Sequence, residues 1–249
     1  MQPLLTKAVS EFQSDSEFKG TITVSDVGSA QGIADLMDNQ ADIAASDISP
    51  TQTGLDETGL VDHQIAVLAV AVVVSPDISA SLTNISVSDL RGIYTGAITD
   101  WTQVAGWKVA GMPISVYYQR AGSGIRTVFE TYGIMTALSD QQLASYSSFS
   151  VFDSSATLTK ALQGAKGAIG YAAMPFCSEV TMLQVEGVQP SYENVYTGKY
   201  KIWACQHLYT KGEPTGPVKS FLDFLSNEDF QESVAEIGYG LISEMKVSR

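Results

Sequence analysis

The sequence is poor in basic residues. Of its 249 residues only 14 are Lys or Arg, against 27 Asp or Glu, which gives a formal net charge of −13. A surface that binds nucleic acid needs a basic face, and this composition offers little material for one. We therefore expect no nucleic-acid partner. An anionic ligand would have to be captured by local dipoles and one or two arginines, because the overall charge repels it.

Histidine and cysteine are also scarce, which limits metal and redox chemistry. His63 and His207 have no ligand-like spacing to each other or to the cysteines, so we expect no metal site. The sequence also lacks the G-x-x-x-x-G-K-[ST] loop that binds nucleotides, and no cofactor is predicted. Cys177 and Cys205 stand 205 − 177 = 28 residues apart. We expect two partly buried thiols, with a disulfide as the alternative.

No apolar run approaches the roughly 18 residues that a membrane-spanning helix requires. The longest run, Ile65 to Val74, is typical of a buried strand. Met1-Gln2-Pro3 lacks the basic and apolar segments that open a signal peptide. We expect either a cytosolic protein or an exported one whose leader is not part of this sequence.

The sequence does have many hydrophobic residues, 45% of the total. They occur in patterns that alternate between those typical of strands and those typical of helices. Apolar periodicity predicts helices over 4–12, 33–37, 87–94, 127–132, 156–162, 218–225 and 230–237. It predicts strands over 21–24, 42–45, 65–74, 113–117 and 168–173, and a β-rich stretch over 201–209. This alternation indicates an α/β fold with mostly parallel sheets, and the break near Pro76 indicates a second lobe.

The turn Gly122-Ser123-Gly124 has the composition of an anion site. It lies between a predicted strand and a predicted helix, with Arg120 on one side and Arg126 on the other. Unpaired backbone N–H groups, the positive end of the helix dipole, a hydroxyl and a guanidinium meet at such a helix start. The turns at Gly28-Ser29 and Ala45-Ser46-Asp47 share this design. Ligands of open α/β sheets bind where such turns gather, although each could also be an ordinary capped helix start.

Asp47 fits an anion site only if the anion carries a proton. A carboxylate accepts hydrogen bonds and cannot donate one. Hydrogen phosphate can donate a proton to it, whereas fully ionised sulfate cannot and would face a like charge. Asp47 could therefore select by rejecting sulfate, and its alternative role is a helix N-cap or turn aspartate.

Ser123 also raises the possibility of a serine hydrolase. The segment Ala121 to Ile125 is not G-x-S-x-G, because alanine and isoleucine occupy the glycine positions. Only His63 or His207 could act as the general base, and a surface or packed histidine is the alternative for each.

Several short motifs follow one another in a fixed order and spacing along nearly the whole sequence. They are Gly28-Ser29-Ala30-Gln31-Gly32, Ala41 to Asp47, Leu90 to Gly96, Ile98 to Trp101, Gly122-Ser123-Gly124 with Phe129, Gly167 to Tyr171, and Asn194 to Tyr200. Each motif is weak by itself, but as an ordered set they resemble the phosphate-binding proteins of bacterial ABC transporters, the PstS-like family of type II periplasmic binding proteins.

The resemblance implies a two-lobed α/β fold with a ligand cleft between the lobes. Lobe 1 is expected over 1–75 and 179–249, and lobe 2 over 76–178. By position, the expected phosphate contacts are Ser29, Asp47, Ser123 and Gly124, with Ser46 as a weaker candidate. The threonine of the family's GSGT motif is Ile125 here, which loses a hydroxyl but keeps a backbone N–H.

Two arginines are candidates for the ligand contact, Arg120 and Arg126. Many relatives place the ligand arginine four residues before the serine of GSG, where this sequence has Gln119. Arg120 is one residue nearer, and a one-residue shift along a strand turns a side chain to the other face unless a bulge restores it. Arg126 matches the arginine of GSGTR variants, so we slightly favour Arg126 and keep Arg120 as the alternative.

Two further departures are visible. The family opens with a strand and a hydroxyl-rich turn before the helix that begins here near Pro3, so one hydroxyl contact is not part of this sequence. Relatives also often carry an aspartate in the strand that corresponds to 65–74, where this sequence is apolar.

The resemblance implies an exported, non-enzymatic, monomeric protein that captures inorganic phosphate and delivers it to an ABC permease. It would lie in the periplasm, or on the outer face of the cell membrane as a lipoprotein. The first alternative is a binding protein for another oxyanion or a small phosphorylated solute, because Gln119, Arg120 and Ile125 differ from the family pattern. The distant alternative is the serine hydrolase.

Overall fold

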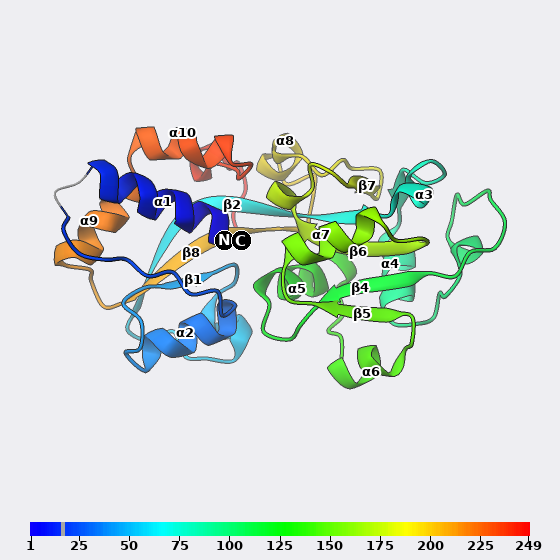
Figure 1. Cartoon of the computed structure of the whole chain (residues 1–249), viewed down its shortest axis with the longest axis horizontal. Coiled ribbons are helices and arrows are strands. Elements are labelled where there is room, and N and C mark those ends of the chain that lie inside the picture. Colours follow the sequence, from blue (N-terminus) through cyan, green and yellow to red (C-terminus); the bar gives the residue numbers. More distant parts are fainter. Residues whose placement is uncertain (16–17) are drawn as a thin grey trace. The chain divides into compact units, whose positions relative to one another are not determined.

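The computed structural model describes residues 1–15 and 18–249 as an α/β protein (Figure 1). The chain divides into two compact units. Unit 1 contains residues 1–68 and 204–244, and unit 2 contains residues 69–203 and 245–249. The chain thus passes between the units within strands β2 and β8, at 68/69 and 203/204, where the sequence predicted boundaries at 75/76 and 178/179. Among the described residues, no helix combines the length and apolar character needed to cross a bilayer.

Unit 1 combines a small sheet with helices. Its elements are α1 (Gln2–Asp15), α2 (Ser29–Met37), β1 (Ala44–Ser46), η1 (Pro50–Thr53), the first part of β2 (Leu60–Val74), most of β8 (Trp203–Lys211), α9 (Gly216–Leu225), α10 (Glu228–Glu236) and η5 (Ile242–Glu244). Strand β1 pairs antiparallel with β8, with Ser46 opposite His207. One core cluster joins α2 to this pair through Ile33, Leu36, Ala44 and Tyr209.

The amphipathic helix α1 buries one face of unit 1. Leu4, Ala8 and Phe12 recur at helical spacing and are almost fully buried. Phe12 meets Phe221 of α9 edge-on, with ring centroids 5.3 Å apart, and Figure 1 shows α1 beside α9. The expected helix over 4–12 is therefore present and longer than predicted.

The predicted strand at Thr21 to Val24 is wrong. The structure has irregular, largely exposed backbone there. Its β-branched residues have strand propensity, but a strand exists only where another strand supplies hydrogen-bond partners, and propensity alone does not decide it.

Unit 2 contains most of the strands, including β3 to β7 and the second part of β2. Its elements are α3 (Pro76–Ser79), β3 (Asn84–Ile85), α4 (Val87–Tyr94), η2 (Trp101–Gln103), β4 (Ser115–Gln119), α5 (Gly124–Val128), the π-helical segment η3 (Phe129–Ile134), α6 (Asp140–Ser145), β5 (Phe149–Phe152), α7 (Ser155–Gln163), β6 (Ala168–Ala173), η4 (Met174–Phe176), β7 (Thr181–Val185) and α8 (Tyr192–Tyr196). Strand β4 pairs parallel with both β5 and β6, and the second half of β2 pairs antiparallel with β6 and β7.

The apolar run at residues 65–74 is buried as predicted, and the strands β6 and β7, which pair with residues 70–74, run antiparallel to it. The run is continuously hydrophobic because side chains on both of its faces are buried, and not because it pairs in parallel with these two strands. Ala71 and Val73 of β2 share a core cluster with Leu158 and Leu162 of α7, which covers this part of the sheet (Figure 1).

A stack of aromatic rings connects this core to the end of β4. Phe129 and Tyr171 stack in parallel with centroids 4.1 Å apart, and Tyr94 packs against Phe129 at 4.8 Å. The backbone N–H of Gln119 donates a 3.0 Å hydrogen bond to the hydroxyl of Tyr171. The last residue of β4 is therefore fixed by the core immediately before the glycine-rich turn.

Candidate functional site

In unit 1 the predicted ligand residues gather where β1 ends and α2 begins. Ser29 is the first residue of α2, preceded by Gly28 with a φ of 87° that favours glycine. Its hydroxyl accepts a 3.1 Å hydrogen bond from the backbone N–H of Asp47, just beyond β1. Because that bond uses an acceptor lone pair, the Ser29 proton can still be donated. The structure thus brings Ser29 and Asp47 together, and both are more than nine-tenths buried.

The carboxylate of Asp47 is held by a residue that the sequence did not predict. Gln206, fully buried on β8, donates a 2.6 Å hydrogen bond from Nε2 to Oδ1 of Asp47. Tyr239 is buried close enough to feel the charge of Asp47. The pKa of its phenol is raised first by burial and second by that charge. Among the described residues, Gln206 Oε1 and the Tyr239 hydroxyl are the two buried side-chain atoms without a hydrogen-bond partner. Buried polar atoms without a partner are few in native proteins, and each calls for an explanation such as a functional role.

Ser46, the weaker candidate, is engaged in the turn itself. Its hydroxyl donates to the carbonyl of Ile48 at 2.7 Å and accepts from the N–H of the same residue at 3.2 Å. The side chain thus closes a local turn that presents Asp47.

In unit 2 the turn after β4 has the predicted strand–turn–helix arrangement. Gly122 adopts a φ of 78°, and Ser123 is the N-cap of α5, its hydroxyl accepting from the N–H of Arg126 at 3.3 Å. Gly124 and Ile125 are buried in the first turn of this helix, which continues into η3. The first N–H groups of a helix have no partner within it, so those of Gly124 and Ile125 are available to an acceptor such as an anion.

Arg126 is enclosed by oxygen acceptors. Its Nε donates to Glu130 at 2.5 Å, Nη2 donates to the carbonyl of Leu138 at 2.8 Å, and Nη1 contacts Asp140 and the carbonyl of Gln119. The side chain is only 6% exposed. Burial opposes its charge, while the hydrogen bonds to Glu130 and Asp140 outweigh that effect and raise its pKa. The guanidinium therefore already has two carboxylate partners.

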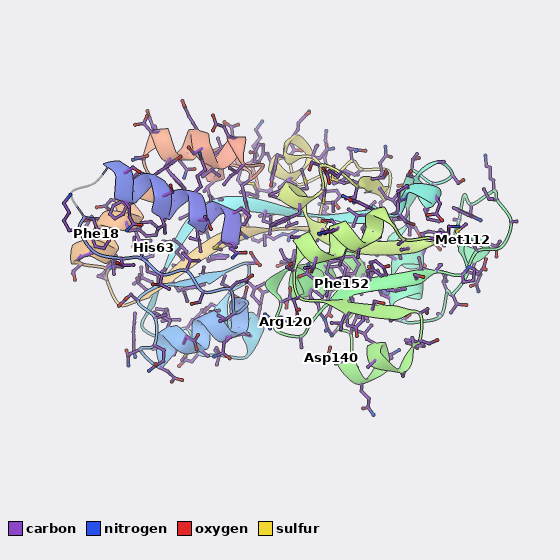
Figure 2. All side chains as sticks on the ribbon, in the orientation of Figure 1. Phe18, His63, Met112, Arg120, Asp140 and Phe152 are labelled. Atoms are coloured by element: carbon purple, nitrogen blue, oxygen red, sulfur yellow. The ribbon has the colours of Figure 1, made fainter. Side chains whose placement is uncertain are left out.

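Arg120 is in a different environment. Its side chain is 42% exposed, and its Nε lies 3.6 Å from Oδ1 of Asp153, an exposed carboxylate. Figure 2 shows Arg120 at the end of β4 and Asp140 at the start of α6. An exposed ion pair of this length contributes little and can be exchanged for another anion at small cost.

The two histidines have other partners than Ser123. His63 contacts the hydroxyl of Thr210 at 3.0 Å, and His207 contacts Asp62 at 2.8 Å (Figure 2 labels His63). Ser123 donates to Gln119 and accepts from Arg126, so its hydroxyl is bonded as a cap. In the part of the chain that the structure describes, no cluster of three His, Cys, Asp or Glu residues could hold a metal ion.

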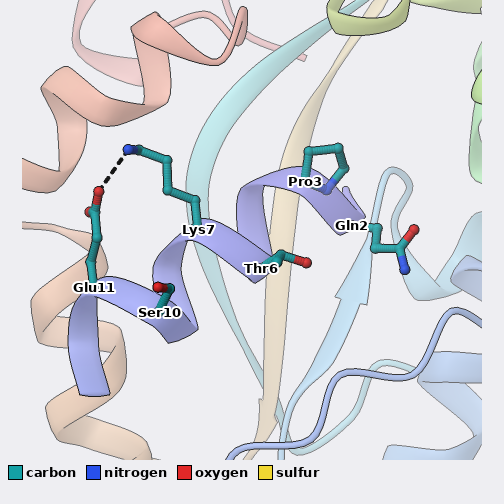
Figure 3. A pocket seen from close by; sticks show the side chains of 6 residues that line it. All are labelled: Gln2, Pro3, Thr6, Lys7, Ser10 and Glu11. Carbon is teal, nitrogen blue, oxygen red and sulfur yellow. Dashed lines mark ion pairs between the residues drawn. The ribbon is translucent and has the colours of Figure 1, made fainter. Parts of the chain in front are cut away.

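The cavities of unit 1 differ in character. One of about 450 Å³ lies along the exposed face of α1, lined by Gln2, Pro3, Thr6, Lys7, Ser10 and Glu11 (Figure 3). Its Lys7–Glu11 ion pair is an ordinary i,i+4 contact on a solvated helix face. A second cavity of about 560 Å³ is lined by the irregular segment 21–27 and by Ser29, Ala45 and Asp47. Ser29 and Asp47, two of the three predicted ligand residues of unit 1, thus line a cavity, and Ser46 does not.

Comparisons with known proteins place the chain in a family. The model of the PBP superfamily domain matches residues 1–228. The phosphate-binding protein PstS of Bacillus subtilis is 37% identical over 253 aligned residues, which cover all of this chain and 80% of that protein. The phosphate-binding protein PstS 2 of Streptococcus agalactiae is 27% identical over 131 residues, 51% of this chain and 45% of that protein.

Solved structures agree on the fold. A substrate-binding protein of Clostridium perfringens solved with bound phosphate has a TM-score of 0.80 and 24% identity, covering 96% of this chain and 95% of that one. An ABC-type phosphate transport receptor from Vibrio cholerae has a TM-score of 0.76 and 23% identity, with the same coverage. On the family model and the identity along its whole length, the chain belongs to the PBP superfamily and, within it, to the PstS family of substrate-binding proteins.

Proposed function

We propose that this protein is an extracytoplasmic solute-binding protein that captures inorganic phosphate and delivers it to the permease of an ABC transporter. The Bacillus subtilis relative, aligned over the entire chain, is a phosphate-binding protein. The observation on this chain that carries the proposal is the buried side chain of Asp47, a residue whose backbone N–H is bonded to the hydroxyl of Ser29. An acceptor and a donor at that spot suit an oxyanion that itself carries a proton.

Both units contain groups that suit a phosphate ion, and each set is described by itself. In unit 1 these are the hydroxyl of Ser29 and the carboxylate of Asp47, with Ser46 shaping the turn. In unit 2 they are the hydroxyl of Ser123, the N–H groups of Gly124 and Ile125, and an arginine. Hydrogen bonds to a charged acceptor are stronger than neutral ones, so a few well-placed donors suffice for a dehydrated anion.

Arg120 is the arginine that the geometry favours for direct contact. The guanidinium of Arg126 donates four hydrogen bonds to protein oxygens, two of them on carboxylates. Releasing it would leave Glu130 and Asp140 without their cation. Arg120 is 42% exposed, and its ion pair with exposed Asp153, at 3.6 Å, is of the kind that contributes little. Arg126 then acts by holding the turn that carries Ser123.

The protein turns over no substrate in this proposal and acts as a monomer outside the cytoplasm, in the periplasm or attached to the outer face of the membrane by a lipid. The tests are a hydrolase assay with ester and phosphoester substrates, and the mass of the protein in solution. Hydrolysis lost in Ser123→Ala would favour an enzyme instead.

Isothermal titration with phosphate and with sulfate at neutral pH tests the ligand. Heat with phosphate and little or none with sulfate is the expected result, and the absence of heat with phosphate would remove the assignment. A thermal-shift panel of arsenate, molybdate, sulfate and small phosphate esters distinguishes another oxyanion or phosphorylated solute, because a ligand of the folded state raises the melting temperature.

A further inference from the structure

A chain of buried hydrogen bonds runs from the backbone of β6 to the hydroxyl of Ser123. The N–H of Ala173 donates to Ser155 Oγ at 3.0 Å, and Gln119 Nε2 donates to the same oxygen at 3.1 Å. At its other end the Gln119 amide accepts from Ser123 Oγ through Oε1, at 2.6 Å. Gln119 is 2% exposed and Ser155 is 5% exposed, so both lie behind Ser123 and away from solvent.

In this arrangement the only proton of the Ser123 hydroxyl is donated inward. A hydroxyl has one proton and two lone pairs, and one lone pair already accepts from the N–H of Arg126. An anion oxygen is an acceptor and needs that proton. If Ser123 simply turned it outward, the buried Oε1 of Gln119 would lose its donor, which would weaken binding.

Rotation of the Gln119 amide by half a turn removes this conflict. The two ends of a primary amide have nearly the same shape, so Nε2 and Oε1 exchange places with no movement of the chain. Nε2 then donates to Ser123 Oγ, and Oε1 accepts the proton of Ser155, which still accepts from Ala173. Every buried group keeps a partner, and the Ser123 proton is available to the anion.

We propose that Gln119 and Ser155 are positioning residues that switch Ser123 from donating inward to donating to the bound anion. The proposal rests on the proposed phosphate site and extends it to two residues that do not touch the ligand. Glutamine suits the role because its amide both donates and accepts. The backbone of Gln119 is meanwhile held on both sides, by Tyr171 through its N–H and by Arg126 through its carbonyl.

A double-mutant cycle in phosphate affinity tests the switch. Ser123→Ala, Ser155→Ala and the double variant are titrated with inorganic phosphate beside the wild type, with Ser150→Ala on the exposed face of β5 as control. Ser155→Ala is expected to weaken affinity about 10-fold in the wild-type background and not at all in the Ser123→Ala background. Equal losses in both backgrounds would show a general structural effect and overturn the switch.

A second measurement does not depend on the stability of the variants. In wild-type protein labelled with ¹⁵N, the side-chain amide signal of Gln119, assigned with Gln119→Leu, should shift when phosphate is added, because Nε2 changes its acceptor. A signal unchanged at saturating phosphate would overturn the switch. If the wild type binds no phosphate at all, the proposed function fails first, so the two failures are distinguishable.

Discussion

Gln206 donates a 2.6 Å hydrogen bond to Oδ1 of Asp47, and both side chains are buried in unit 1. The two residues are 159 positions apart in the chain and meet because β1 pairs antiparallel with β8, Ser46 lying opposite His207. The bond fixes the orientation of the carboxylate and occupies one of its two oxygens. The geometry of Asp47 therefore depends on a residue from the opposite end of the sequence.

Gln206→Leu should lower phosphate affinity without unfolding the protein. Leucine fills a similar volume but cannot donate, so the carboxylate loses its positioning bond. We expect the dissociation constant for phosphate to rise about 10-fold, which corresponds to roughly 1.4 kcal/mol, because a hydrogen bond to a charged group is lost. Titration calorimetry measures it, and exposed Gln189→Leu is the matched control. Unchanged affinity in a folded Gln206→Leu protein would contradict a positioning role.

Asp47→Asn should narrow the preference for phosphate over sulfate. An ionised carboxylate rejects an anion without a proton, whereas an amide can also donate to one. We expect phosphate affinity to fall and sulfate affinity to rise, measured by titration of both anions at neutral pH. Asp42→Asn, an exposed position shortly before β1, should leave the ratio unchanged. If Asp47→Asn also leaves it unchanged, the carboxylate is not the selective element.

Replacing the two arginines by methionine one at a time should affect different properties, stability for Arg126 and phosphate affinity for Arg120. Arg126→Met leaves Glu130 and Asp140 without the buried cation between them, so we expect a loss of about 3 kcal/mol in the free energy of unfolding. Arg120→Met removes a half-exposed charge with a weak 3.6 Å partner, so stability should hardly change while phosphate affinity falls. Urea unfolding and titration of both variants separate the roles. A stable Arg120→Met protein with wild-type affinity would return the ligand contact to Arg126.

The sequence predicted those helices and strands that are determined by residues within the element or next to it. The helix Val87–Tyr94 begins where Ser86 accepts a hydrogen bond from the N–H of Asp89, a cap that the sequence shows directly. The strand Ala168–Ala173 is a short apolar run that follows Gly167. The mixed α/β class follows from the same alternation of patterns and is confirmed.

Features set by distant partners could not be predicted in this way. The β-branched stretch Thr21 to Val24 has strand propensity, but pairing decides whether a strand forms. The expected helix start at Thr127 lies earlier, at Gly124, because the cap made by Ser123 begins the helix at once. Gln206 belongs to no motif, and only the pairing of β1 with β8 brings it to Asp47. The sequence does show Gln119 in the position of the relatives' arginine, but not its bond to Ser123.

The structure keeps both Cys177 and Cys205 as thiols, which makes an alkaline test possible. Cys177 is 3% exposed, and burial raises the pKa of its thiol to about 12. An unfolded thiol ionises near its ordinary value of about 8.5, so between these two values the unfolded chain releases a proton that the folded chain keeps. The contribution of the Cys177 thiol to the free energy of unfolding is therefore fully present below the pKa of the unfolded chain. It is lost as the pH rises toward the pKa of the folded chain.

The free energy of unfolding should accordingly fall above about pH 8.5, by about 3 kcal/mol between pH 7.5 and pH 10.5 from Cys177 alone. Burial also raises the pKa values of the phenols of Tyr171, Tyr200 and Tyr239, which adds a loss of the same sign at higher pH. Urea unfolding at pH 7.5, 9.0 and 10.5 measures the slope. Cys177→Ala should be less stable than the wild type at pH 7.5 and lose less as the pH rises, while Cys205→Ala keeps the buried thiol and is the matched control. Parallel slopes in Cys177→Ala and the wild type would show that the Cys177 thiol ionises as readily in the folded chain as in the unfolded one.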